Sequence, residues 1–300
     1  MNDTVMTKPQ FDRTAEDLGN IVELGHVNVT VPDQSKAIAF YLMGLGLTRD
    51  PYLMSGLENM WVNVGRGQFH LPTRNPPQVV RGTTGLVVPD LEALLKRLDY
   101  VKSQGFLDGT KFSFKQVGDV VETVCPWGNH LRVHGPDPEK FGPLRLGMPY
   151  VELDVPVGTK LDKIVQFYTE ILGAIAGLAS DERGAYAWAS CSADCQVIYR
   201  ESAKKHGKYD GHHIQITLAD FSGPHKKLVE RGLITEESDQ HQYRFVDLVD
   251  VDTNKSLFQI EHETRSMRHP MFNRTFINRN PDMNNRNFVP GYEVGIWALA

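Results

Sequence analysis

The chain has 300 residues, of which 41% are hydrophobic, and a formal net charge of -5 at pH 7. This length and composition suffice for two domains with cores of ordinary size. The small negative charge, without a cluster of Lys and Arg, argues against a nucleic-acid partner. No apolar run is long enough to cross a membrane, and the polar residues 1–20 do not resemble a secretion signal. The three cysteines fit a reducing compartment, so we expect a cytoplasmic protein without a membrane partner.

The first clear elements follow an N-terminal arm. Polar and apolar residues alternate over 26–31, which is the two-residue period of a strand. Pro32-Asp33 ends this strand, and Asp33 or Ser35 can cap the helix that follows. Glycines after that helix can end it. The first polar residue of the strand is a histidine, His26.

The same order of signals returns three more times along the chain. Strands starting at His26, Thr84, Tyr150 and His213 recur at intervals of about 60 residues, which is the mark of an internal repeat. Each start leads into a helix and then into short strand-like segments. Such a unit cannot bury the face of its sheet alone, so we expect the units to pair.

This fourfold order of one strand, one helix and three strands, over roughly residues 22–265, resembles the vicinal oxygen chelate superfamily. That superfamily includes glyoxalases, bleomycin-resistance proteins and extradiol dioxygenases. The resemblance implies an α+β fold in which four βαβββ modules form two pseudo-symmetric, cup-shaped domains. It does not select an activity, because one fold can carry many functions.

Composition predicts the boundaries. We expect an arm over 1–21, a first domain of modules one and two over 22–142, and a second domain of modules three and four over 147–264. A linker rich in Pro and Gly separates the two domains. The aromatic residues of 265–300 predict a tail that packs on the domains, and they lead us to expect a homo-oligomer.

Candidate ligands occur in modules one and four and are almost absent from modules two and three. The polar-face residues of the first and last strands of modules one and four are His26, His70, His213, Gln259 and Glu261. Two pairings of the modules are open, one with two and three with four, or one with four and two with three. Only the second pairing brings these residues into a single cup.

Ring-cleaving dioxygenases of the hydroquinone type resemble this second case. Carried onto this chain, their ligands would be His26, His213 and a carboxylate from the last strand. The spacing of first-strand and last-strand positions in the other modules favours Glu261 as that ligand, with Gln259 beside it as a substrate-binding residue. The apolar neighbours of Gln259 leave it open as the ligand instead.

Further roles follow for two residues near this set. His70 is expected as the catalytic acid or base, with a fourth-ligand role also open. Arg265, at the start of the tail, is expected to bind an acidic or phenolic substrate. A single strand histidine is more often structural than a ligand, but matching positions in two repeats favour a metal site.

Two histidines and one carboxylate leave open positions for a substrate and for O2. We therefore expect an enzyme with one divalent metal, Fe(II) first and Mn(II), Zn(II) or Ni(II) as alternatives. The expected activity is that of a ring-cleaving dioxygenase, an oxidoreductase acting on a catechol- or hydroquinone-like small molecule. The rivals are a metal-dependent lyase or isomerase of glyoxalase type and a metal-free small-molecule binding protein.

Overall fold

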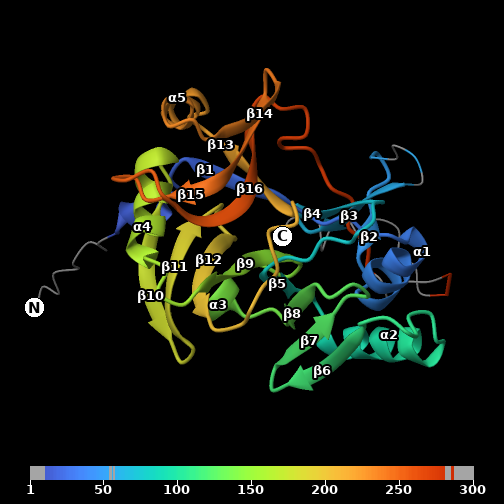
Figure 1. Ribbon diagram of the computed structural model, residues 1–300. Helices are drawn as coiled ribbons and strands as arrows, with labels where there is room; N and C mark the ends of the chain where they lie inside the picture. Colours follow the sequence, from blue (N-terminus) through green and yellow to red (C-terminus); the bar gives the residue numbers. More distant parts are fainter. Residues whose placement is uncertain (1–10, 54–55, 57, 281–284, 287–300) are drawn as a thin grey trace, which may run out of the picture.

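A computed structural model describes residues 11–53, 56, 58–280 and 285–286 (Figure 1). The order of strand, helix and three strands occurs four times along these residues. This confirms the predicted α+β fold of four βαβββ modules arranged as two cups. Within the arm, a short 3₁₀ helix covers η1 (Arg13–Glu16), while residues 1–10 lie outside the described part.

The first half of the chain contributes modules one and two. Module one consists of β1 (Ile21–Asn28), α1 (Gln34–Ala37), its π-helical continuation η2 (Ile38–Gly44), β2 (Thr48–Arg49), β3 (Asn59–Val64) and β4 (Gly67–Pro72). Module two consists of β5 (Gly82–Val87), α2 (Leu91–Ser103), β6 (Ser113–Val117), β7 (Val120–Val124) and β8 (His130–His134). The connection to the second half contains the short helix α3 (Pro138–Phe141).

The second half repeats this plan. Module three consists of β9 (Gly147–Pro156), α4 (Leu161–Gln166), its π-helical continuation η3 (Phe167–Ile171), β10 (Ala176–Asp181), β11 (Gly184–Ser190) and β12 (Gln196–Ser202). Module four consists of β13 (His213–Leu218), α5 (Ser222–Glu230), β14 (Ile234–Asp239), β15 (Gln242–Val249) and β16 (Ser256–Ser266). Arg265 therefore belongs to the last strand and not to the tail.

Two eight-stranded mixed sheets combine the modules across the two halves. The first sheet has the order β14-β15-β16-β13-β1-β4-β3-β2 and joins module four to module one. The second has the order β10-β11-β12-β9-β5-β8-β7-β6 and joins module three to module two. This pairing places the candidate ligands of modules one and four on one sheet. The division into domains at 22–142 and 147–264 stays a prediction, and neither sheet follows it.

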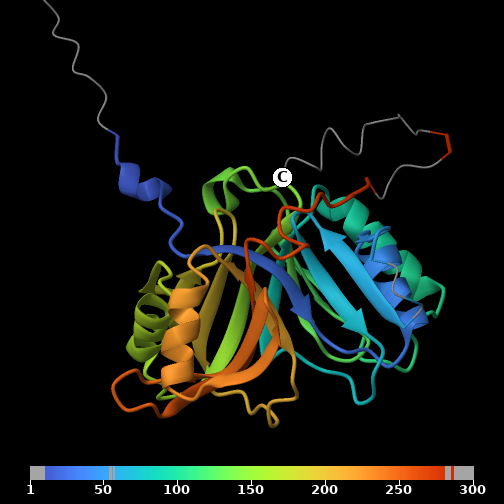
Figure 2. The ribbon, with the colours of Figure 1, turned by 90° about the horizontal axis from the view of Figure 1, so that it is seen from above.

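The helices pair differently from the sheets. Figure 2 shows α1 and α2 together at one side of the strands and α4 and α5 together at the other. Phe40 of η2 contacts Phe112 beyond α2 with ring centroids 5.9 Å apart, and Lys227 of α5 donates to the Glu170 carbonyl of η3 at 2.6 Å. Helix packing therefore holds each half together, while the sheets join the halves.

Aspartates begin the first two helices. Asp33 accepts a hydrogen bond from the Lys36 amide at 3.1 Å, and Asp90 accepts one from the Ala93 amide at 3.0 Å. Each aspartate satisfies an amide that has no partner within the first helical turn. This observation resolves the N-cap of the first helix in favour of Asp33.

The apolar face of each sheet packs against the helices and forms the core. One buried polar chain crosses this core: the Tyr168 hydroxyl lies 2.6 Å from that of Tyr199 and 2.7 Å from Nε2 of His262. Nδ1 of His262 donates to the Ile260 carbonyl at 3.0 Å, so Nε2 accepts from Tyr168. Because Tyr199 is on β12 and His262 is on β16, this series of hydrogen bonds links the two sheets.

The tail continues from β16 onto module one. Arg274 pairs with the fully buried Asp50 at 2.6 Å. The side chain of Asn278 accepts from the Gly65 amide at 3.0 Å and donates to the Gly65 carbonyl at 2.7 Å. Residues 267–280 thus pack on module one, while 281–284 and 287–300 lie outside the described part. The expected homo-oligomer stays a prediction.

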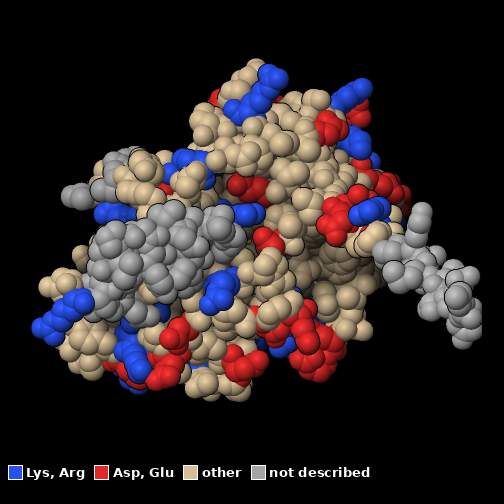
Figure 3. All heavy atoms as spheres, turned by 180° about the vertical axis from the view of Figure 1, so that it is seen from behind, with Lys and Arg blue, Asp and Glu red and all other residues tan. Residues whose placement is uncertain are grey.

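The surface mixes both signs of charge. On the face in Figure 3, basic and acidic side chains of the described residues are interspersed, as a net charge of -5 allows. Among the described helices, none has the length and apolar character that a membrane span requires.

Candidate metal centre

Three side chains on the polar face of the first sheet converge. His26 on β1, His213 on β13 and Glu263 on β16 each offer one ligand atom, and these atoms lie within 4.8 Å of one another. The three residues are 1%, 7% and 3% exposed. The Glu263 carboxylate places Oε1 4.0 Å from Nε2 of His26 and Oε2 3.4 Å from Nε2 of His213.

The two imidazole nitrogens that face this group have no hydrogen-bond partner among the described residues, although both are buried. A buried polar atom without a partner costs free energy, and native proteins rarely contain one without a reason. A divalent cation bound by both nitrogens and the carboxylate would satisfy them. The donor set of two histidines and one carboxylate therefore fits a metal ion.

Strand register explains why these residues meet. β1 runs antiparallel to β13 and pairs His26 with Gln215, and β13 runs parallel to β16 and pairs Gln215 with Glu263. His26 and Glu263 therefore occupy one row across the sheet. His213 lies in the adjacent row on the same face, because its position is two residues from Gln215.

A missing side chain makes room beside His26. A Cβ atom at Gly25 would lie 1.9 Å from Oε1 of Gln215, so the buried Gln215 amide occupies the space above this glycine. Gln215 in turn donates to the Thr217 hydroxyl at 3.1 Å. The neutral side chain of Gln215 is thus held in place between His26 and Glu263.

Glu261, the carboxylate expected from the sequence, is outside the converging group. Its Oε1 lies 3.2 Å from Nδ1 of His213 and 2.6 Å from Nη1 of Arg244. Glu261 is the register partner of His213, as the spacing predicted, but it faces the outer nitrogen of that ring. A carboxylate this close to Nδ1 favours a proton on that nitrogen and leaves Nε2 as the nitrogen that faces the group. Glu263 takes the place of Glu261 as the candidate ligand. The pairing of β1 with β13 puts His26 in the same row of the sheet as Gln215 and Glu263.

Two arginines hold the Glu263 carboxylate. Nη2 of Arg244 lies 2.5 Å from Oε2, and Nη2 of Arg265 lies 2.6 Å from Oε1. Burial raises the pKa of Glu263, but His26, His213 and Arg265 outweigh burial and keep this pKa well below its ordinary value. Burial lowers the pKa of His26 well below its ordinary value. An ionised carboxylate and a neutral imidazole are the forms that bind metal.

Arg265 was expected to bind substrate, and the structure gives it a different set of contacts. Besides Glu263, its Nε donates to Oε1 of Gln242 at 3.0 Å, and the residue is 8% exposed. These contacts occupy the guanidinium inside the cup. Arg265 supports the carboxylate, and its role toward a substrate stays a prediction.

His70 lies next to the group without joining it. Its ring stacks on Trp61 with centroids 3.8 Å apart and lies 5.6 Å from the ring of His26. Nε2 of His70 is 2.6 Å from Oδ1 of Asn59, so this nitrogen donates to the amide oxygen. Burial, followed by the charge of His213, lowers the pKa of His70 to about 3. The catalytic role of His70 and its fourth-ligand role both stay predictions, and His70 is not among the described residues whose ligand atoms converge.

Gln259 lies at the rim and does not reach the group. Its side chain is exposed and donates to Oδ1 of Asp247, its register partner, at 3.2 Å. The Gln259 carbonyl accepts a hydrogen bond from Arg81. The structure therefore gives no support to Gln259 as a ligand.

A small cavity adjoins the group on the side of His26. Gln68, Gln215, Met271 and Phe276 contribute to its wall. The described tail thus forms one wall of the cup beside the candidate ligands. Sequence reasoning expected a packed tail but could not place it here.

Comparisons with known proteins extend these observations. No family model and no curated protein matches the chain. A candidate dioxygenase from Bacillus subtilis superposes with a TM-score of 0.55 and 14% identity, covering 84% of this chain and 87% of that one. Glyoxalase I from Zea mays superposes with a TM-score of 0.55 and 15% identity, covering 81% and 92%. This chain has the vicinal oxygen chelate fold. At such identities the fold alone is shared, and the converging His26, His213 and Glu263 must carry any functional argument.

Proposed function

We propose that this chain is a mononuclear metal-dependent enzyme in which His26, His213 and Glu263 hold one divalent ion. The observation that carries the proposal is the convergence of two buried, unpaired imidazole nitrogens on one carboxylate. Nitrogen and oxygen donors of this kind suit Fe(II), and also Mn(II), Zn(II) and Ni(II). We propose Fe(II) first, because a facial set of two histidines and one carboxylate is typical of non-haem iron oxygenases.

The activity we propose is oxidative cleavage of a catechol- or hydroquinone-like ring. When bound, the ion supplies positions for the oxygen atoms of a substrate and for O2. Three protein ligands favour this reaction over chemistry that needs four, and His70 is not among the described residues whose ligand atoms converge. A relative of similar fold from Bacillus subtilis also carries the name of a candidate dioxygenase.

The chain's own residues would orient the site. Glu261 holds Nδ1 of His213, while Arg244 and Arg265 fix the two oxygens of Glu263. Such contacts keep ligand orientation constant while substrates exchange. His70 is our candidate for handling the proton of a phenolic hydroxyl; because burial lowers its pKa to about 3, it would act as a neutral hydrogen-bond partner more than as a strong base.

Metal content tests this proposal. Protein purified without added metal should contain about one iron per chain, since one three-residue set binds one ion. His26→Ala, His213→Ala and Glu263→Gln should lose the metal. Glu261→Gln is the matched control and should keep most of it, because Glu261 is not among the three converging ligands.

Oxygen uptake separates the candidate activities. Uptake with catechols or hydroquinones, abolished in Glu263→Gln, would support the dioxygenase. A bound metal without uptake would instead favour a lyase or isomerase of glyoxalase type, a second candidate suggested by the likeness to glyoxalase I from Zea mays. Absence of metal, with no thermal stabilisation by Fe(II), Mn(II), Zn(II) or Ni(II), would refute both and leave a metal-free binding protein.

A further inference from the structure

A second hollow lies in the other cup. It has a volume of about 310 Å³ and lies between strands β9, β11 and β12 of the second sheet and the segment around α3. Its walls include Phe141, Tyr150, Trp188 and Gln196. None of the candidate metal ligands belongs to it, because those three residues are all on the first sheet. Its size is at the lower end of the range for small-molecule sites.

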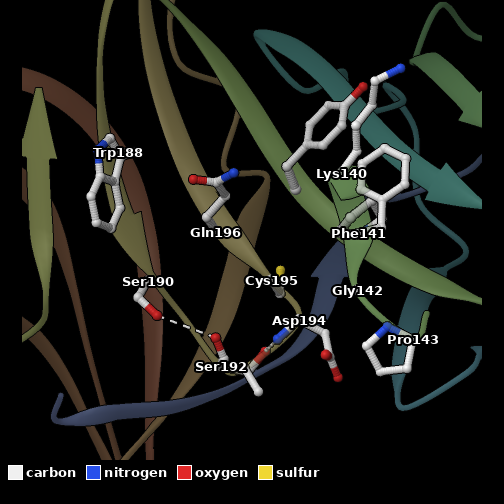
Figure 4. Close-up of a pocket in the computed structure, with 13 residues that line it drawn as sticks. Lys140, Phe141, Gly142, Pro143, Trp188, Ser190, Ser192, Asp194, Cys195 and Gln196 are labelled. Carbon is white, nitrogen blue, oxygen red and sulfur yellow. Dashed lines mark hydrogen bonds between the residues drawn. The ribbon is translucent and has the colours of Figure 1, made fainter. Parts of the chain in front are cut away.

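Aromatic side chains stand on two sides of this hollow. Figure 4 shows the Gln196 amide between Trp188 on one side and Phe141 on the other. A Cβ atom at Gly177 would lie 3.2 Å from three atoms of the Trp188 indole, so the glycine lets the indole lie against β10. The indole is thereby fixed at the wall of the hollow. A flat, fixed indole is a stacking surface for a planar ring.

The Gln196 amide is a polar group inside the hollow, which Ser190, Ser192 and Asp194 also line. It is half-buried, and its side chain makes no hydrogen bond to another described residue. Its register partner Tyr150 already places its hydroxyl 2.8 Å from Nε2 of His134. A side-chain amide carries both a donor and an acceptor. A ligand edge with one acceptor and one donor would therefore match it.

The cations around this cup are paired with carboxylates, and the Asp194 carboxylate lines the hollow without a salt bridge to a described residue. Lys140 at the rim lies 3.2 Å from Asp137 and 3.7 Å from Asp119. Deeper in the cup, Arg183 and Arg200 pair with Glu152 at 2.7 and 3.3 Å. Because these cations already have partners, the hollow favours an uncharged ligand over an acid.

We propose that this hollow binds a planar, uncharged heteroaromatic molecule, with its ring against Trp188 and a donor–acceptor edge on the Gln196 amide. The site is separate from the candidate metal centre. It does not depend on the proposed activity, since its residues come from the second sheet.

Adenine is the probe that tests the proposal, because it carries an amino donor beside a ring acceptor. Isothermal titration should give one adenine per chain. Gln196→Leu should weaken binding about tenfold, the scale of one or two lost hydrogen bonds. Trp188→Phe should weaken it less, because a smaller ring still stacks. Benzimidazole, which lacks the adjacent donor and acceptor, should bind about tenfold more weakly than adenine.

Two control variants decide where the probe sits. Gln116→Leu, on the exposed strand β6, should leave adenine affinity unchanged, and so should Glu263→Gln in the metal centre. Circular dichroism establishes that each variant is folded. The proposal is overturned if the native chain does not bind adenine at millimolar concentration. It is equally overturned if Gln196→Leu binds as the native chain does, or if Glu263→Gln abolishes binding.

Discussion

The two cups share one strand plan but differ in how their polar groups are satisfied. In the first, Nε2 of His26 and of His213 is buried without a partner among the described residues. In the second, Glu152 accepts from both terminal nitrogens of Arg183 at 2.7 Å, and Arg200 donates to both oxygens of Asp181 at 2.9 and 2.8 Å. A polar concave face is thus common to both cups. The buried imidazole nitrogens without a partner distinguish the first cup, which suits a metal, from the second.

The centre of the second cup is filled by a side chain. A Cβ atom at Gly85 would lie 2.4 Å from Cζ of Tyr150, so the tyrosine ring covers this glycine. Tyr150, Gly85 and Arg132 form one row across the sheet. No histidine of the described residues stands in that row. The same architecture therefore leaves a ligand group in one sheet and an aromatic floor in the other.

The largest expected difference between the cups is stabilisation by metal. At about 1,000 times its dissociation constant, a divalent ion that binds only the folded state adds about 4 kcal/mol to the free energy of unfolding. We expect this gain for the native chain and for Glu152→Gln, but not for Glu263→Gln. Denaturant unfolding with and without the ion measures it. An equal gain in Glu263→Gln would place the metal elsewhere.

Removing the central carboxylate of the second cup should destabilise the fold itself. Glu152→Ala leaves the guanidinium of Arg200, whose side chain is 6% exposed, without its buried carboxylate partner. We expect a loss of about 3 kcal/mol in the free energy of unfolding, with metal content unchanged. Glu122→Ala is the control: Glu122 pairs with Lys115 and Arg132, none of these three side chains is buried, and its loss should cost less than about 1 kcal/mol. Equal losses in the two variants would contradict the distinction.

Acid should weaken the buried link between the sheets. Burial lowers the pKa of His262 to about 4, whereas an unfolded histidine titrates near about 6.5. Between these values the unfolded chain binds more protons, so stability falls as pH falls. This one group contributes up to about 1.4 kcal/mol per pH unit. Urea unfolding between pH 7 and pH 4 measures how the free energy of unfolding changes with pH, and this change should be smaller in His262→Gln. An unchanged pH dependence would show that His262 is not its source.

The smallest expected change in stability is that of a glutamine at the rim of the first sheet, and a buried glutamine of the same sheet provides the contrast. Gln259→Ala removes an exposed rim side chain and should change stability by less than about 0.5 kcal/mol, with full metal content. Gln215→Ala, in the buried row beside His26, should cost about 1–3 kcal/mol. Elemental analysis and denaturant unfolding measure both. Loss of metal in Gln259→Ala would restore it as a ligand.

Sequence patterns predicted the modules because each is a local feature. The alternation of polar and apolar residues in a strand, the aspartate that caps the helix and the glycine that ends it lie close together in the sequence and recur. The Phe-Tyr pairs of modules one and three even share their structure, since both lie in π-helical continuations, η2 and η3. The two histidines on the first strands of modules one and four were found in the same way.

Errors arose where one strand's position depends on another strand. Thr84 was aligned with His26, yet it pairs with Leu131 and Val151 on the buried face, and Gly85 takes the concave position. Spacing within module four favoured Glu261 over Gln259, and that ligand assignment stays a prediction, whereas the residue in the row of His26 is Glu263. The antiparallel pairing of β1 with β13 joins residues nearly 200 positions apart, and no local pattern encodes its register.

The sequence by itself determined the repeat, the alternation of polar and apolar faces, and the residue types available to a metal, because these depend on neighbours along the chain. Tertiary structure alone decided that module one pairs with module four and that Glu263 faces His26 and His213. It also decided that Arg265 is occupied by a carboxylate and that a second hollow lies beside Gln196. These outcomes depend on strand register and on which polar atoms find partners, and both are set only when distant segments meet.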